Sequence, residues 1–594
     1  MSILEMDSNY IIGLKAIARF MKNEQLIIFI FAILIGILSG GAVIIFREAI
    51  DIIGIIIFHG KADHLIELSR SLPPWKLILI PSLSGLGVGV LIYFFVPFNR
   101  PHGVADVIEA SALKGGAMSS RLGVISACIS ALSIGGGASV GREGPAVHLG
   151  ASLASWVGRQ FCFSRKSIRT LLGCGVAAAV SSSFSAPIAG ALFASEVILG
   201  NYALGSLTPI VIASVFGTAV SRLYFGNSSS FTLTDYTITS FWEFPAFILL
   251  GCMCAVAAIL FMRLTFLTQE FAEKTKLPVW LRPAFAGLVI GGMSIPLPEI
   301  LGIGYEVAEL AMTGQLAFQM MIMIGIGKIV ATALCLGFGF SGGVFSPSLV
   351  IGAMTGATFG LTAATVFPEL ASNIGTYTIV GMGGIAAAVL GAPISTTLII
   401  FEITGDYALS LAVLLTIVTA TELTNHFFGK SFFQKQLARR NINLQKGLES
   451  EIMGSIKVAT LVKSDFNSRS PTVKKNTKLG EIRNHMKSSK FSELFVLAEG
   501  NILHGTITLT CIGDFAFDRN LDNLVTAADI AQLHPPYLVE ADNIETALKT
   551  MKDTEIEFIA VVNNDRSMRF LGYVSFHEIM STYNHAILAH HQNS

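Results

Sequence analysis

One glutamate follows a long stretch of the chain that contains no charge. Between Arg121 and Arg142 no charged residue occurs, and then Arg142 and Glu143 appear in "GREGPAVH", between Gly141 and Gly144. Glycine permits backbone angles that are closed to other residues, and proline suits the first turn of a helix. The segment therefore predicts a helix N-terminus that carries a carboxylate into apolar surroundings.

A carboxylate in such a place must be compensated or mobile, because a charged side chain at the centre of a bilayer costs roughly 2.5–3.5 kcal/mol. The segment "SGGVFSP" repeats the pattern, with Val344 and Phe345 just ahead of a Ser-Pro pair. Free N–H groups at two facing helix N-termini would form an anion site, and Glu143 could occupy it as a gate. The alternative is that Arg142 and Glu143 form a buried ion pair.

Composition places these motifs in a membrane. The chain has 594 residues, of which 52% are hydrophobic and only 13% are charged, whereas soluble domains average about 25% charged residues. The formal net charge of +0 gives no indication of a nucleic-acid partner. Seven scattered cysteines form no disulfide framework, and no metal site is predicted.

The membrane part contains repeats. Long apolar runs at 26–46, 77–97 and 244–262 alternate with shorter Gly/Ala/Ser-rich runs, which are tolerated at membrane depth when they line a cavity. An Ala-Pro-Ile motif leads from Ala186 to Glu196 and again from Ala392 to Glu402. "GREGPAVHLGA" and "GVFSPSLVIGA" are separated by nearly the same interval, which predicts two homologous halves.

A second repeat follows the membrane part. After about Lys446 charged residues become frequent, and similar segments begin at Pro471 and Pro536. Each runs through a helical pattern and a strand-like run to a glycine, Gly505 or Gly572. This alternation predicts two small α/β units.

Four motifs in order, "GREGPAVHLGAS", "SAPIAGALFASE", "GFSGGVFSPSLVIGA" and "GAPISTTLIIFEITG", resemble the CLC family of chloride channels and proton–chloride exchangers. The C-terminal repeat resembles a pair of CBS domains, roughly 453–517 and 525–584. The resemblance implies an α-helical polytopic membrane protein, a CLC-type inverted-repeat bundle of short tilted helices, followed by a cytoplasmic α/β CBS pair.

The resemblance also implies a domain plan. We expect a cytoplasmic N-terminal lead-in at 1–25, a transmembrane anion-transport domain at 26–440, a linker at 441–452 and tandem CBS domains at 453–594. It implies a homodimer with one pore in each subunit, multi-pass in the inner cell membrane with both termini cytoplasmic. Lys15, Arg19 and Lys22, which precede the first apolar run, agree with a cytoplasmic N-terminus.

Site residues are carried over from the same motifs. Glu143 falls on the family's gating glutamate, and Gly144, Val344 and Phe345 fall on motifs whose backbone amides line the anion path. The expected ligands are chloride and other small anions, with protons as an alternative.

Two positions of the central anion site depart from the family pattern. In "PHGVA", the match to the first anion motif, His102 precedes Gly103 and replaces a serine, so its imidazole either donates an N–H or points aside. In "GKSFFQKQLARR", Phe433 replaces the pore tyrosine and loses its hydroxyl. We expect a weaker central anion site.

A third departure concerns protons. In family exchangers an inner proton-accepting glutamate follows the residue matched by Glu196, but this chain has Val197, which cannot carry a proton. Glu196 and Glu402 recur at the repeat position and are predicted to be structural. The loss favours an uncoupled, channel-like protein; the alternative is a proton-coupled chloride antiporter.

Other functions fit less well. The CBS pair could bind an adenine nucleotide or have a purely structural role, and both alternatives stay open. Cys511 and Glu578 stand at the two positions where ribose-binding acids are expected. A CBS-regulated cation transporter would need several converging acids, and the membrane segments are poor in them. "HEIMS" has Ser581 where a zinc peptidase needs its second histidine. We therefore expect neither an enzyme nor a catalytic residue, and the motifs do not resemble the fluoride-exporting branch.

Overall fold

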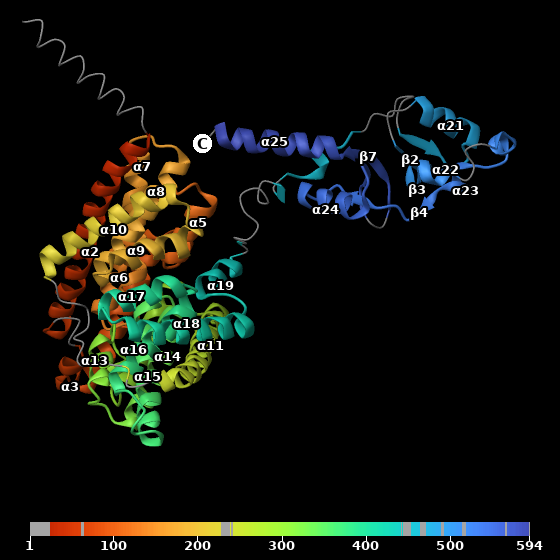
Figure 1. Ribbon diagram of the computed structural model, residues 1–594. Coiled ribbons are helices and arrows are strands. Elements are labelled where there is room, and N and C mark those ends of the chain that lie inside the picture. The colour runs from red at the N-terminus through yellow and green to blue at the C-terminus, as the bar shows by residue number, and fades with distance from the viewer. Residues whose placement is uncertain are drawn as a thin grey trace, which may run out of the picture. The chain divides into compact units, whose positions relative to one another are not determined.

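A computed structural model describes residues 24–60, 65–226, 238, 241–440, 442, 453–454, 456–463, 471–488, 492–513, 518–564 and 567–592. The chain divides into two compact units, Met1–Ile442 and Asn443–Ser594 (Figure 1). The predicted lead-in at 1–25 and the predicted linker at 441–452 lie almost entirely outside the described residues.

The first unit is built of helices. Its first half comprises α2 (Glu24–Phe58), α3 (Leu65–Ser71), α4 (Pro74–Phe95), α5 (Val104–Leu113), α6 (Ser120–Gly135), α7 (Glu143–Gln160), α8 (Arg165–Phe184), α9 (Pro187–Phe193), a π-helical turn η3 (Ala194–Leu199) and α10 (Leu204–Phe225). Its second half comprises α11 (Phe244–Lys274), α12 (Arg282–Ser294), α13 (Tyr305–Met312), α14 (Phe318–Gly337), α15 (Phe345–Val366), α16 (Ile374–Leu390), α17 (Pro393–Thr404), α18 (Tyr407–Phe428) and α19 (Phe432–Arg439).

Eight helical spans among the described residues are long and apolar enough to cross a membrane. Large apolar side chains such as Ile45 on α2 and Leu223 on α10 are exposed on the outer faces, as a lipid-facing surface requires. The predicted run at 26–46 is shorter than α2, because α2 continues through Arg47. The Arg47 guanidinium lies 4.3 Å from the centroid of the Phe225 ring, and this contact accommodates the charge.

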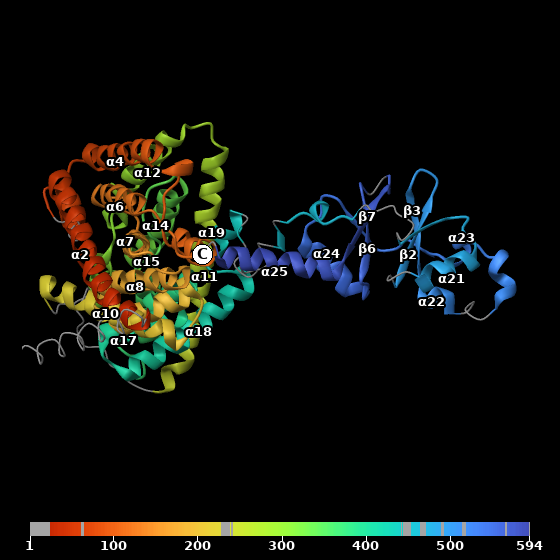
Figure 2. The ribbon, with the colours of Figure 1, turned by 90° about the horizontal axis from the view of Figure 1, so that it is seen from above.

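The two halves repeat the same packing. α7 packs on α8 as α15 packs on α16, and α2 packs on α10 as α11 packs on α18. α4 lies against α12, which Figure 2 shows, and α9 lies against α17. These paired contacts confirm the predicted inverted-repeat helical fold.

Glycines bring the inner helices close together. A Cβ on Gly150 of α7 would lie 2.5 Å from the carbonyl oxygen of Gly175 of α8. Gly352 of α15 approaches Gly381 of α16 in the same manner in the second half. Small residues at such contacts let the backbones pack directly, so α7 lies tightly against α8, and α15 against α16.

The second unit contains two similar α/β modules, as predicted. The first has β1 (Thr472–Lys474), α21 (Leu479–Ser488), β2 (Glu493–Ala498), β3 (Ile502–Thr508), α22 (Leu509–Gly513), α23 (Ala527–Ile530) and β4 (Gln532–Leu533), in sheet order β1-β2-β3-β4. The second has β5 (Tyr537–Val539), α24 (Ile544–Thr554), β6 (Phe558–Val562), β7 (Phe570–Ser575) and α25 (Phe576–Gln592), in sheet order β5-β6-β7.

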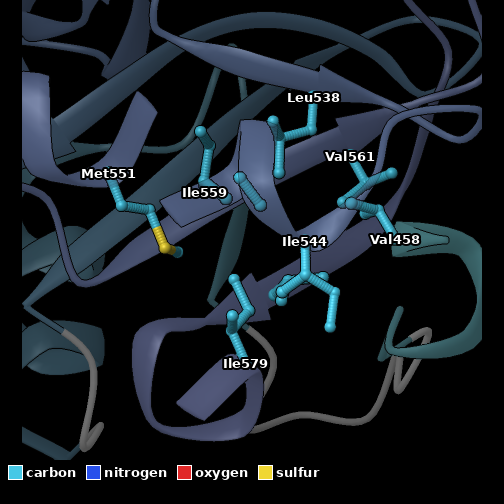
Figure 3. Close-up of a cluster of buried hydrophobic side chains, with 9 residues drawn as sticks. Val458, Leu538, Ile544, Met551, Ile559, Val561 and Ile579 are labelled. Atoms are coloured by element: carbon cyan, nitrogen blue, oxygen red, sulfur yellow. The ribbon is translucent and has the colours of Figure 1, made fainter. Parts of the chain in front are cut away.

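Alternation along β6 divides its side chains between two cores. Ile559 and Val561 pack under α24 in the cluster shown in Figure 3. Ala560 and Val562 point to the other face and pack with Phe495 of the first module. Successive side chains of a strand point to opposite faces, so one strand serves both the core of its own module and the contact between modules.

Glu493, at the start of β2, gives this unit a pH-dependent stability. Burial and the neighbouring Glu557 raise its pKa from 4.5 to about 7. Between these pH values the folded unit binds more protons than the unfolded chain, so its free energy of unfolding falls as the pH rises. We expect Glu493→Gln to stabilise the fragment 443–594 by on the order of 1 kcal/mol at about pH 8, and to have little effect at about pH 4.5.

Thermal unfolding of the fragment at both pH values measures this effect. Glu540→Gln, which changes an exposed glutamate, is the matched control and should be neutral. Equal changes in stability of the Glu493→Gln fragment at the two pH values would contradict the conclusion that Glu493 causes the pH dependence.

Candidate anion-binding site

A cavity of about 380 Å³ lies inside the first unit. Its wall contains every residue predicted for the gate and the anion path, namely His102, Gly103, Glu143, Gly144, Val344, Phe345 and Phe433. These residues come from the loop before α5, the starts of α7 and α15, and the start of α19. The structure therefore brings together motifs that are far apart in the sequence.

Two helix N-termini meet at this cavity. Gly141 and Gly343 form a two-residue antiparallel bridge, with N–H to carbonyl distances of 2.8 and 2.7 Å in the two directions. A Cβ on Gly144 would lie 3.0 Å from the Cα of Gly343, so this approach requires glycine. The two bridged glycines are equivalent in the repeats, and the bridge therefore lies at the pseudo-twofold axis.

The amides at these helix starts are available. Neither the Arg142 nor the Val344 side chain caps its own helix. Within the described part of the chain, no acceptor takes the N–H of Gly144, Val344 or Phe345. Unpaired N–H groups at helix N-termini carry partial positive charge and attract anions.

The Glu143 carboxylate is held by two hydroxyl groups. Tyr305 donates to Oε1 at 2.7 Å, and Ser346 donates to Oε2. All three residues are buried. Hydrogen bonds to a charged group contribute about 1.5–3 kcal/mol each, so two of them offset the roughly 2.5–3.5 kcal/mol that a charge costs at membrane depth.

Arg142 is a more distant partner of Glu143. Its Nε lies 3.9 Å from Oε1, at the limit of an ion pair, and its guanidinium lies 5.3 Å from the centroid of the Tyr305 ring. The carboxylate is therefore oriented by neutral hydroxyls more closely than by a cation. A neutral donor can release the carboxylate without leaving an unpaired buried charge behind.

Glu196 and Glu402 exchange caps between the halves. Glu402 accepts the N–H groups of Ile188 and Ala189 at 2.9 and 2.7 Å. Glu196 accepts those of Ile394 and Ser395 at 3.1 and 2.8 Å, and the Ser395 hydroxyl at 2.7 Å. Glu196 of the first half thus caps α17 of the second half, and Glu402 of the second half caps α9 of the first half.

The remaining predicted residues are less directly engaged. Val197 lies in the π-helical turn η3 and is not part of the cavity wall, although Phe193 at the end of α9 is. The Phe433 ring is buried beside Phe432. Gly103 donates its N–H to Asp106 Oδ2 at 2.9 Å, so this amide is already used.

The cavity wall also contains basic residues that sequence reasoning missed, Arg100, Arg439 and Arg440. Arg100 and Arg440 both pair with Asp106, at 2.9 and 3.0 Å, so this cluster has more cations than acids. Arg439 pairs with Glu270 and Glu273 instead. Positive charge in a cavity wall attracts anions. These arginines stand in unremarkable polar stretches, and only tertiary packing brings them together.

Tyr305 and Ser346 were also missed as partners of Glu143. Ser346 stands within the quoted "SGGVFSP", where a hydroxyl next to a predicted anion site was the available signal. Tyr305 opens α13 after Gly304, whose φ is 91°. No spacing in the sequence relates Tyr305 to Glu143, so only the fold identifies it.

In the second unit, the two places matched to ribose-binding acids offer no free carboxylate. Cys511 lies 3.3 Å from the Thr508 hydroxyl. Glu578 accepts from the Ser575 hydroxyl at 3.0 Å and pairs with Lys463.

The fold and the cavity together define a multi-pass membrane protein of the inverted-repeat transport class. The sequence profile of the voltage gated chloride channel family matches residues 84–425, more than half of the chain. The chain therefore belongs to the voltage gated chloride channel family, whose members transport chloride, as the motifs predicted. A CBS domain profile matches residues 527–585.

Curated relatives cover the membrane unit. A putative chloride channel protein ClcB-like from Ralstonia nicotianae is 32% identical over 384 residues, which are 64% of this chain and 90% of the relative. The voltage-gated ClC-type chloride channel ClcB of Escherichia coli is 29% identical over 414 residues, 69% of this chain and 98% of the relative.

Solved structures confirm the fold. A slow cyanobacterial Cl⁻/H⁺ antiporter superposes with a TM-score of 0.63 at 24% identity, covering 70% of this chain and 98% of that chain. A eukaryotic CLC transporter superposes with a TM-score of 0.62 at 19% identity, covering 93% of this chain and 97% of that chain.

The exchanged caps lead to a stability prediction. Loss of a helix cap costs about 0.5–2 kcal/mol, so Glu196→Ala and Glu402→Ala should each lower the thermal unfolding midpoint in detergent by a few degrees. Glu422→Ala, which removes an exposed glutamate of α18, is the control. Midpoints equal to that of the control would show that the two caps do not stabilise the fold.

Proposed function

We propose that the chain conducts chloride and other small anions through the cavity in each subunit, and that Glu143 is the gate. The single observation that supports this most strongly is the position of its carboxylate, which lies at the junction of two uncapped helix N-termini in the cavity wall. A carboxylate there takes the place of a permeating anion. Weak, amide-based binding lets the ion leave again.

The gate opens when the carboxylate leaves the helix junction. Protonation removes its charge, and with it most of its attraction to the free amides. An anion in the cavity can then take the same place. Tyr305 and Ser346 hold the closed position, since they donate to opposite oxygens of the carboxylate.

Removal of the gate carboxylate should remove the pH dependence. In liposomes loaded with chloride well above its Kd, so that a change in affinity does not alter the rate, chloride efflux through the wild type should rise several-fold between about pH 7 and pH 4, while efflux through Glu143→Ala stays within about twofold. Efflux is measured with a chloride electrode after release by a potassium ionophore. A steep pH dependence that survives in Glu143→Ala would show that Glu143 is not the main proton-sensitive gate.

Loss of either hydroxyl should loosen the closed gate. Tyr305→Phe and Ser346→Ala each remove one charge-assisted hydrogen bond, so chloride efflux at about pH 7.5 should rise by up to roughly tenfold. Tyr377→Phe removes a hydroxyl from another buried tyrosine, on α16, for which no contact with Glu143 is seen among the described residues, and it is the control. A fall in chloride efflux in both Tyr305→Phe and Ser346→Ala would contradict the proposal that these two hydroxyls hold the gate closed.

We infer that transport is not coupled to protons, because Val197 leaves the inner side without a carboxyl at the expected place. The second candidate is a proton-coupled chloride antiporter. The presence of His102, a titratable group, in the cavity wall favours it. The solved relative described as a Cl⁻/H⁺ antiporter also favours it.

We further propose a homodimer in the inner cell membrane with both termini cytoplasmic. Lys15, Arg19 and Lys22 ahead of α2 support the orientation. For the second unit we propose a structural role first and adenine nucleotide binding second. The engagement of Glu578 by Lys463 and Ser575 supports this order.

A further inference from the structure

Two histidines lie against each other beside the cavity. His102 precedes α5 and lines the cavity, and His148 belongs to α7, the helix that begins with Glu143. Their ring centroids are 5.6 Å apart with an interplanar angle of 76°, an edge-to-face arrangement. His148 is only 2% exposed.

Each ring has a buried nitrogen without a hydrogen-bond partner among the described residues, Nε2 of His102 and Nδ1 of His148. A neutral imidazole has one donor and one acceptor nitrogen, whereas a protonated imidazole has two donors. A buried polar atom without a partner costs about 1–3 kcal/mol. An anion that accepted an N–H of a protonated ring would supply such a partner.

The charges around the pair come from four elements. They are Arg100 in the loop before α5, Asp106 and Glu109 on α5, Lys114 at its end, Arg440 after α19, and Glu143 on α7. Asp106 pairs with Arg100 and Arg440 at 2.9 and 3.0 Å, and Glu109 pairs with Lys114 at 2.7 Å. Both acids of α5 are thus already neutralised.

This balance leaves a protonated histidine without a counter-ion of its own. An anion in the cavity would supply the missing negative charge. Two protons on rings this close would repel each other, so the pair holds one proton at a time.

We propose that His102 and His148 form a proton-binding pair in which uptake of one proton accompanies the binding of one anion in the cavity. The protonated pair presents an N–H from His102 to the anion, in addition to the backbone amides. The proposal rests on the proposed function and deepens it, because it adds a second group by which protons act on the anion site.

The direction of the effect follows from linkage. Because the protonated pair binds the anion better, anion affinity is highest at low pH and falls as the pH rises and the pair loses its proton. His102 shares the cavity wall with Arg100 and Arg440. In this proposal the proton of the pair returns to the side from which it came, and the anion crosses without it.

Glu143 also responds to protons, so the test uses Glu143→Gln protein. Chloride is titrated into the purified full-length variant in detergent by calorimetry, at about pH 5.5 and about pH 8, in buffers of different ionisation enthalpy. We expect affinity about tenfold higher at the lower pH. Proton uptake is the slope of log affinity against pH, so we expect an average uptake of roughly 0.4 proton per chloride between these pH values. His426→Gln, which changes an exposed histidine of α18, is the control and should alter neither the pH dependence of chloride affinity nor the proton uptake.

In the same background, His102→Asn and His148→Gln should each reduce the pH effect to about twofold or less. An undiminished pH dependence of chloride affinity in His148→Gln would overturn the proposal that the two histidines act as a pair. Equal affinity at both pH values without proton uptake, in Glu143→Gln alone, would overturn this inference and leave the proposed function intact. Absence of chloride binding at either pH would contradict the proposed function itself.

Discussion

The structure depends on an electrostatic constraint at the point where α7 and α15 begin. Two helix N-termini meet across the Gly141–Gly343 bridge, and their positive ends face the same small volume. Such an arrangement is stabilised by negative charge nearby. Glu143 supplies that charge from within the chain, and in the proposed function a permeating anion supplies it instead. The proposed gate and the proposed anion site therefore result from the same requirement.

The N-termini of α9 and α17 show a second arrangement, in which carboxylates are bound directly to the backbone amides. At α9 and α17, Glu402 and Glu196 reach across from the opposite halves and accept two backbone N–H groups each. Those N-termini are permanently neutralised, and the exchange joins the halves. At α7 and α15 the carboxylate belongs to the helix itself and is held chiefly by two side-chain hydroxyls, with Arg142 at the limit of an ion pair. A carboxylate at a helix N-terminus thus stabilises the fold at α9 and α17, and in the proposed function it acts as the gate at α7 and α15.

Much of this was predictable because amide-based sites are encoded in short, contiguous motifs. "GREGP" and "GVFSP" specify both helix starts, and the repeat of Ala-Pro-Ile with its glutamate specifies the halves. Tyr305, Arg439 and Arg440 were not predictable, since only the packing of α13 and α19 brings them to the cavity. His148 stood within the first quoted motif, yet its pairing with His102 depends on how α5 meets α7.

We propose that anions pass a gate whose protons are not carried across the membrane. The most direct test is to record external pH while chloride leaves liposomes that hold the purified protein, driven by a potassium ionophore and without an uncoupler. We expect chloride efflux without driven proton movement, because the chain has Val197 in place of an inner acid. Protons moving uphill in a fixed ratio to chloride would contradict it and would show an antiporter.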